Sequence, residues 1–206
     1  MKRLRFVTCD VFTDRPFGGN PLAVFPSVSG LDTPTMQAIA REFNFSETTF
    51  VEAATKPGTA FKVRIFTPSR ELPFAGHPTL GTAHVLVHSM VAGAGDHVDL
   101  VLEEGVGPVP VRVTLDAGLP VFAELTAARV PEAGPPPPDI PTLARVLSLQ
   151  ADDLLGGEFG PQAFSCGIPF LYIPLKSRAA LERARIDRTR FDESLAGYAA
   201  PDCFVF

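Results

Sequence analysis

The segment over residues 69–90 holds the groups of this chain best suited to chemistry. A loop over 69–76 leads into His77-Pro78, and proline is favoured in the first turn of a helix because an N–H there has no partner in any case. The unpaired N–H groups and the positive dipole at a helix N-terminus attract anions. The sequence therefore predicts an anion-binding site beside Gly76 and His77.

The helix predicted over 78–90 has no clear polar face. Its residues are small or apolar nearly all the way round, and a helix of that kind belongs in a protein interior. Gly81 and Ala83 leave room for strands to approach it closely. We therefore expect a curved sheet that encloses this helix.

The other histidines and the cysteines favour structural roles. His84 and His88 stand four residues apart on the predicted helix, a spacing that metal ligands use, but no acidic residue lies between them and packing near the core is the favoured interpretation. Cys9, Cys166 and Cys203 are odd in number and widely spaced, which indicates neither a disulfide framework nor a zinc site. We find no dinucleotide-binding glycine motif, P-loop or Schiff-base lysine, and expect neither cofactor nor metal.

Short predicted helices and strands, separated by turn-forming residues, precede and follow the buried helix. A second helix is predicted over 33–44, with Thr33 as its N-cap and Pro34 in its first turn. Its apolar stripe consists of Met36, Ile39, Ala40 and Phe43. Alternating or β-branched patterns predict strands over 4–12, 21–25, 48–53, 61–67, 97–104, 108–115, 120–127, within 164–175 and over 203–206. Shorter helices are predicted over 141–149 and 178–185, the latter capped by Ser177.

Composition narrows the class of protein. The 206 residues are 46% apolar and 20% charged, as in ordinary globular chains, and the net charge of −5 does not favour nucleic acid. The arginines over 183–190 alternate with acidic residues, which indicates a solvated surface. No stretch approaches the roughly 20 apolar residues of a membrane helix, and Asp10 and Asp14 interrupt any signal-peptide core. We expect a soluble, cytoplasmic protein that binds neither nucleic acid nor membranes.

Several motifs occur in order over residues 6–90. They are Asn20-Pro21 after a Gly-Gly loop, SETTF at 46–50, RIFTP at 64–68 and ELPFAGHPTLGTA at 71–83. Together they resemble the PhzF-like family of phenazine-biosynthesis isomerases, and CGIPF at 166–170 extends the resemblance more loosely. The resemblance implies an α+β fold of the diaminopimelate-epimerase type. Its two pseudo-symmetric domains, here over 1–117 and 118–206, would each wrap a curved, mostly antiparallel sheet round a central buried helix, with the active site between them.

The resemblance also implies the chemistry. The proton-moving group of the family is the glutamate of the SETTF-like motif, which is Glu47 here. Facing apolar walls that include Phe45 and Phe50, Glu47 would be partly desolvated, and burial would raise its pKa toward the operating pH. The alternative is a surface cap or ion pair. The substrate carboxylate would be held by His77 and Gly76, with Ser46 also at the site.

Three further assignments complete the expected site. Asn20 would either orient a loop over the substrate or stabilise its own turn, and His77 would also serve as a helix cap. Glu71 is predicted to be structural, as a partner of Arg64 or Arg70. Because epimerase relatives use paired cysteines at helix N-termini and His77 stands at that position here, a two-thiol racemase is not expected.

The second half departs from the family pattern. An acidic residue followed by a Pro-Ala-Thr-Gly-Ser-Ala block, which begins the second buried helix in the family, has no match after residue 120. We therefore expect a C-terminally truncated second domain. The predicted function is a cofactor-independent isomerase of a small, carboxylated, cyclic metabolite, working as a homodimer. The alternatives are an epimerase on the same fold and a truncated, non-catalytic small-molecule binding protein.

Overall fold

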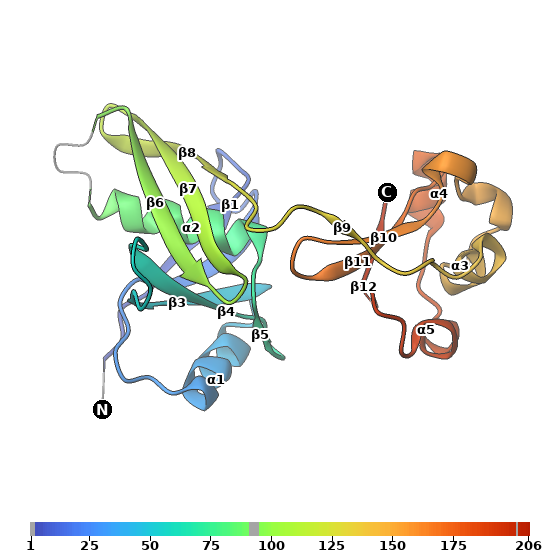
Figure 1. The fold of residues 1–206 in the computed structure, drawn as a ribbon, viewed down its shortest axis with the longest axis horizontal. Coiled ribbons are helices and arrows are strands. Elements are labelled where there is room, and N and C mark those ends of the chain that lie inside the picture. The colour runs from blue at the N-terminus through green and yellow to red at the C-terminus, as the bar shows by residue number, and fades with distance from the viewer. Residues whose placement is uncertain (1–2, 91–94, 201) are drawn as a thin grey trace. The chain divides into compact units, whose positions relative to one another are not determined.

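The computed structural model describes residues 3–90, 95–200 and 202–206, which form two compact units over 1–128 and 129–206 (Figure 1). The first unit contains β1 (Val7–Val11), β2 (Asn20–Phe25), α1 (Thr33–Phe43), β3 (Glu47–Ala53), β4 (Phe61–Phe66), β5 (Glu71–Leu72), α2 (Gly76–His88), β6 (His97–Glu104), β7 (Gly107–Asp116) and β8 (Leu119–Leu125). Its sheet has the order β1-β2-β3-β4-β6-β7-β8, with β5 beside β4. The pairs β2–β3 and β4–β6 are parallel and the rest antiparallel, so the predicted α+β class with a mostly antiparallel sheet is confirmed.

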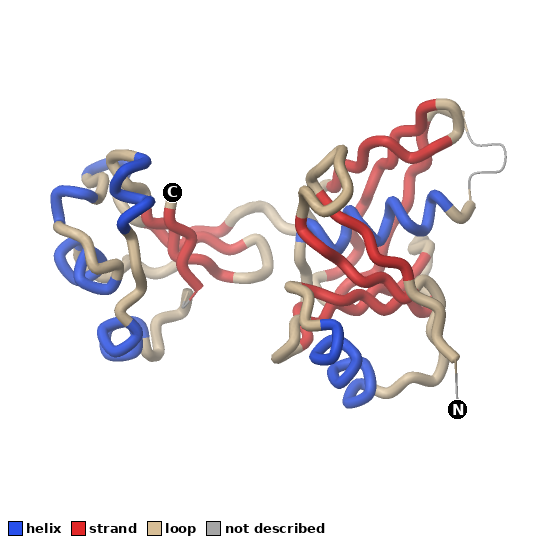
Figure 2. The backbone as a smooth tube through the Cα atoms, turned by 180° about the vertical axis from the view of Figure 1, so that it is seen from behind, coloured by secondary structure: helices blue, strands red, loops and turns tan. Residues whose placement is uncertain are grey.

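Helix α2 is enclosed by this sheet, as its composition predicted (Figures 1 and 2). It contacts strands from both ends of the strand order, β1 and β2 at one end and β7 and β8 at the other. Burial is not confined to a single stripe of the helix, since Pro78, Thr79, Gly81, Thr82 and Ala83 are all buried. The helix spans 76–88 instead of the predicted 78–90, so it begins at Gly76 itself.

Gly81 sets how closely the sheet approaches α2. A Cβ atom added there would stand 2.7 Å from Leu22 Cδ2 and 2.7 Å from Val11 Cγ2, closer than real Cβ contacts allow. Hydrogen at this position therefore lets β1 and β2 lie directly against the helix. The predicted close approach at Gly81 is confirmed.

Helix α1 covers the opposite face of the sheet. Its buried Met36 and Ala40 pack with Phe25, Phe50 and Phe66 in a separate apolar cluster. The predicted N-cap was wrong: Asp32, not Thr33, caps the helix, and its carboxylate accepts a hydrogen bond from Thr35 N at 2.9 Å. Asp32 precedes Thr33 and its carboxylate reaches the N–H of the third helical residue, so Asp32 is the N-cap and Thr33 is the first residue of the helix.

The strand predicted over 120–127 belongs to the first sheet. As β8 it pairs with β7 along its length, for example Val113 opposite Ala123, so it completes the first unit instead of opening the second. The two units consequently divide after Ala128 and not after residue 117. Strand patterns show that a segment is extended, but the partner strand is chosen by the tertiary fold.

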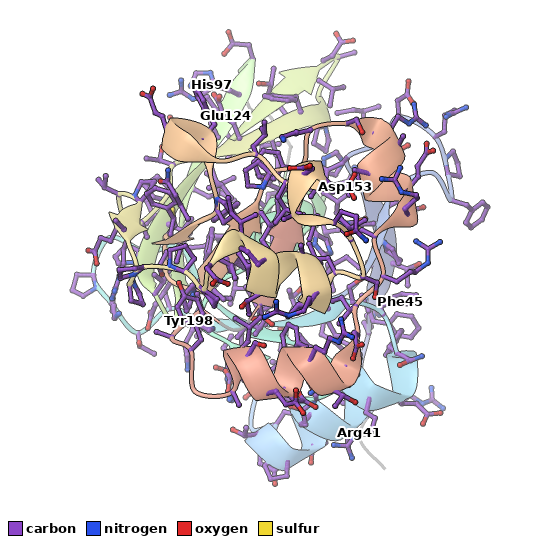
Figure 3. The ribbon with its side chains drawn as sticks, turned by 90° about the vertical axis from the view of Figure 1, so that its right-hand side faces the viewer. Arg41, Phe45, His97, Glu124, Asp153 and Tyr198 are labelled. Carbon is purple, nitrogen blue, oxygen red and sulfur yellow. The ribbon has the colours of Figure 1, made fainter. Side chains whose placement is uncertain are left out.

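The second unit has its own sheet and apolar core. The elements are β9 (Glu132–Ala133), α3 (Ile140–Val146), two 3-10 turns (Ala151–Asp153 and Gly157–Phe159), β10 (Gln162–Ser165), β11 (Pro169–Ile173), α4 (Arg178–Arg183), α5 (Arg188–Leu195) and β12 (Asp202–Val205), with the strand order β12-β11-β10-β9. Ser177 caps α4 as predicted. Among the side chains labelled in Figure 3, Asp153 pairs with Arg183 at 2.7 Å and Tyr198 donates to the Pro135 carbonyl at 2.8 Å.

Across the described part of the chain, no helix has the length and apolar character needed to cross a membrane.

The tight contact at Gly81 predicts that alanine substitutions at two glycines of α2 will have very different effects on the free energy of unfolding. Gly81→Ala is expected to lower the free energy of unfolding by about 1–3 kcal/mol, since the new methyl overpacks against Leu22 and Val11. Gly76→Ala is the matched control, because a Cβ there meets no atom within 4 Å. Urea unfolding should find Gly76→Ala neutral or slightly stabilising; equal losses in both variants would contradict the packing argument.

Glu104, at the end of β6 and only 4% exposed, makes stability depend on pH. Burial raises the pKa of its carboxyl from 4.5 to about 7, so the folded chain keeps a proton that the unfolded chain releases between these values. The contribution of Glu104 to the free energy of unfolding is therefore highest below pH 4.5 and falls by roughly 3 kcal/mol as the pH rises past 7, at about 1.4 kcal/mol per pKa unit.

Glu104→Gln is expected to remove this fall when urea unfolding is compared at acidic and at mildly alkaline pH. Glu124→Gln is the control, since Glu124 is an exposed glutamate on β8, the edge strand of the same sheet. A pH slope that survives in Glu104→Gln and equals that of the control would show that Glu104 is not the group responsible.

Candidate active site

The N-terminus of α2 lacks the side-chain cap that the other α-helices of the described residues have. Asp32, Asp139, Ser177 and Asp187 each accept a hydrogen bond from the first turn of α1, α3, α4 and α5. The N-cap of α2 is Ala75, whose side chain can accept none. The N–H groups of Gly76 and His77 therefore remain available at the positive end of the helix dipole.

Three chain segments meet at this helix end. Glu47 is the first residue of β3 and pairs in register with Leu22 on the parallel strand β2. Pro21, one residue earlier on β2, forms a backbone hydrogen bond with the His77 side chain. The beginnings of β2 and β3 thus lie beside the beginning of α2, which brings Glu47 and His77 together although 30 residues separate them in sequence.

Glu47 and His77 form a close pair that leaves hydrogen-bonding capacity unused. Glu47 Oε2 lies 3.3 Å from His77 Nε2, and the two side chains are only 16% and 9% exposed. The orientation is not that of a hydrogen bond, and neither atom has any other hydrogen-bond partner among the described residues. Buried polar atoms are nearly always paired, so two adjacent unpaired ones indicate a place prepared for a ligand.

Burial shifts both titratable groups toward their neutral forms. Desolvation raises the pKa of the Glu47 carboxyl. It lowers the pKa of the His77 imidazole, against the smaller opposing effect of the Pro21 backbone hydrogen bond. A carboxyl whose pKa lies closer to neutrality can both accept and return a proton, which a fully solvated glutamate does poorly.

The cause of this desolvation differs from the sequence-based expectation. Side chains alternate along a strand, and Glu47 shares its face of β3 with Thr49, whose hydroxyl bonds to Thr82 on α2 at 2.8 Å. Phe50 points to the opposite face and stacks on Phe25 at 4.9 Å, so the expectation that Phe50 lines the site is wrong. Glu47 is desolvated by α2 and its surroundings instead.

The remaining predicted site residues lie close in sequence to the Glu47–His77 pair or to its strands, but they are more exposed to solvent. Asn20 begins β2 and is exposed, and Ser46 precedes Glu47 and is also exposed. The space beside Gly76 is open. Glu71 has the structural role predicted for it, with Arg64 donating to its two carboxylate oxygens at 2.7 and 2.6 Å.

Sequence reasoning missed Phe12. Its ring centroid lies 6.5 Å from that of His77, and the side chain is 71% exposed. Its φ of 64° is unusual for a bulky residue, and strain of this kind concentrates at functional sites. No residue type or spacing in the sequence indicates a positive φ at this position.

The cysteines and the other histidines of the described residues are poorly placed for catalysis or metal binding. Burial raises the pKa values of the Cys9 and Cys203 thiols to about 11, which keeps both protonated and poorly nucleophilic. His84 is half-buried on α2. Its pKa is lowered mainly by burial and to a smaller extent by the charge of the neighbouring His88. Within the described ranges, no group of three or more His, Cys, Asp or Glu side chains is placed to hold a metal ion.

Fold and site together define an α+β protein whose carboxyl–imidazole pair stands at an uncapped helix end. Comparison with known proteins identifies its family: the PhzC-PhzF model, described as phenazine biosynthesis-like protein, matches residues 9–201. The chain therefore belongs to the PhzC-PhzF family, as the motifs over 20–83 indicated.

Individual relatives agree with this membership. The chain is 41% identical over 194 residues to an uncharacterised isomerase of Mesorhizobium japonicum, covering 94% of this chain and 63% of the relative. It is 37% identical over 185 residues to the trans-2,3-dihydro-3-hydroxyanthranilate isomerase of Pseudomonas aeruginosa, covering 89% and 61%. A solved structure described as a predicted epimerase of P. aeruginosa superimposes with a TM-score of 0.85 at 36% identity, covering 99% of this chain and 70% of that one. The chain thus spans less than two thirds of the length of these two curated relatives.

The buried pair predicts that Glu47 is kept at a cost in stability. Because its folded pKa is raised, the free energy of unfolding decreases as the pH rises through that value, and Glu47→Gln avoids the loss. Chemical unfolding at about pH 8 should find the variant more stable by on the order of 1 kcal/mol, with the gain disappearing in acid.

Glu52→Gln is the control for this comparison, because Glu52 lies on the same strand and pairs with Lys62 at 2.9 Å. That variant should be neutral or slightly destabilised at pH 8. A Glu47→Gln protein that is less stable than the unmodified chain at this pH would argue for a structural ion pair instead.

Proposed function

We propose that this chain carries a proton-transfer site of a cofactor-independent isomerase acting on a small carboxylated ring. The observation that carries the proposal is the unpartnered Glu47–His77 pair, 3.3 Å apart, at the uncapped N-terminus of α2. Relatives named as isomerases support it, one of them acting on trans-2,3-dihydro-3-hydroxyanthranilate, a carboxylated ring by name.

The proposed chemistry assigns a role to each group. The N–H groups of Gly76 and His77 bind the substrate carboxylate. Glu47, ionised, removes a proton from a ring carbon, and the electron pair of the broken C–H bond shifts the neighbouring double bond. The proton then returns from Glu47 to another carbon of the same ring, so nothing is oxidised or reduced. No cofactor or metal is required for this sequence.

His77 and the exposed polar residues complete the proposed site. A lowered pKa keeps the His77 imidazole neutral. Its one N–H donates to the Pro21 carbonyl, so Nε2 can accept a hydrogen bond from protonated Glu47 or from substrate. Asn20 adjoins Pro21, which contacts His77, and Ser46 adjoins Glu47; we assign both to substrate binding. We extend the proposal to a cytoplasmic homodimer, on the family resemblance.

An epimerase is the second candidate. The solved relative described as a predicted epimerase favours it, since the same carboxyl could remove a proton from one face of a carbon centre. Epimerisation additionally needs an acid that returns a proton to the other face. Loss of configuration without movement of a double bond would identify this alternative.

The test follows exchange of substrate hydrogens with solvent. The protein is incubated in D₂O with trans-2,3-dihydro-3-hydroxyanthranilate, and deuterium incorporation is measured by NMR. Glu47→Gln is expected to slow exchange by about 10²–10⁴-fold while ligand binding changes little, because only the proton acceptor is lost. Glu52→Gln, on the same strand, should exchange at the unmodified rate.

Undiminished exchange in Glu47→Gln would overturn the role of Glu47. Absence of exchange in the unmodified protein would exclude this compound as its substrate. The same measurement with a series of cyclic carboxylates then distinguishes a different substrate from an inactive site.

A further inference from the structure

Glu104 is a buried carboxyl that the proposed chemistry does not use. It ends β6, is 4% exposed, and contacts the first turns of α2 through Thr79. The Thr79 hydroxyl lies 2.6 Å from Glu104 Oε1 and 2.7 Å from the carbonyl oxygen of Ala75, the N-cap residue. A short chain of polar contacts thus connects Glu104 to the residue before Gly76 and His77.

The number of hydrogens available to these contacts favours a neutral Glu104. A threonine hydroxyl has one hydrogen to donate, yet both neighbouring oxygens lie at hydrogen-bond distance. The carbonyl of Ala75 can only accept. Both contacts are therefore satisfied together when Glu104 is a neutral acid that donates to Thr79 Oγ1, while Thr79 donates to Ala75. Burial of the carboxyl raises its pKa and favours the same neutral form, and this effect outweighs the opposing one of the Thr79 hydrogen bond.

A second contact joins the same two regions. The backbone N–H of Val106 donates to the Pro73 carbonyl at 2.9 Å. A Cβ atom on Gly105 would stand 2.8 Å from Pro73 Cα, so this turn lies directly against the segment that leads into α2. The end of β6 therefore supports residues 73–75 through backbone contacts as well as through Glu104.

We propose that Glu104 is a positioning residue of the site: as a neutral hydrogen-bond donor it holds Thr79, and through Thr79 the Ala75 carbonyl and the first turn of α2. This inference rests on the proposed function. A side-chain cap such as Asp32 on α1 would occupy the N–H groups that a substrate carboxylate needs. Support from the interior fixes the turn and leaves these groups free.

The experiment compares two disruptive with two conservative variants. Glu104→Leu and Thr79→Val break the chain of hydrogen bonds, whereas Glu104→Gln keeps a neutral donor and Thr79→Ser keeps the hydroxyl. NMR spectra report the Gly76 and His77 amides and the His77 ring, with the Leu86 and Val87 amides at the other end of α2 as internal controls. This readout requires no substrate.

We expect Glu104→Leu and Thr79→Val to shift the Gly76 and His77 signals and leave Leu86 and Val87 in place. In the deuterium-exchange assay they should raise KM by about ten-fold, as expected for losing one buried hydrogen bond, with a smaller effect on kcat. Glu104→Gln and Thr79→Ser should match the unmodified protein in both respects.

Two outcomes would overturn the inference. If Glu104→Gln behaves like Glu104→Leu, the ionised carboxylate and not a neutral donor is what the site needs. If all four variants leave the Gly76 and His77 signals unchanged and only lower Tm, Glu104 is purely structural. Should the protein show no exchange with any carboxylate, the proposed function fails, while the NMR comparison still decides the role of Glu104.

Discussion

The structure of the first unit depends on enclosing α2 inside a single curled sheet. A helix with no polar face is stable only when strands cover it on most sides, and close cover requires small residues on its surface. Gly81 meets this need where Val11 and Leu22 touch the helix. Once α2 is fixed in this way, its N-terminus has a defined position among the starts of β2 and β3, and this places His77 beside Glu47.

Enclosure also explains the unusual electrostatics. Groups that water would normally solvate are held in an apolar surrounding, so Glu47 and His77 are both shifted toward neutrality and keep unused hydrogen-bonding atoms. Glu104 experiences the same desolvation; Thr79 gives its Oε1 a partner, while its Oε2 has none among the described residues. The same burial therefore acts on Glu47 and on Glu104, and the raised pKa values of these two carboxyls both lower stability as the pH rises.

Family membership and the geometry of the Glu47–His77 pair both support the proposed proton transfer at carbon. The buried, protonated thiols of Cys9 and Cys203 are poorly suited to accept a proton or to act as nucleophiles, whereas a glutamate and a histidine stand at the helix end in this chain. The uncapped first turn suits a carboxylate, which is the group that anthranilate-type substrates carry.

The family, most of the elements and the burial of the helix after Pro78 were predictable from the sequence alone, because they follow from local periodicity and from motifs contiguous in the chain. The sequence also indicated Glu47, His77 and Gly76, through those motifs. The folded structure was needed to show that Phe50 faces away from Glu47, that β8 joins the first sheet, and that Glu104 reaches Thr79 across 25 residues. Each of these depends on which strand pairs with which and on the resulting face of each side chain. Such pairing joins residues distant in sequence, and no local pattern encodes it.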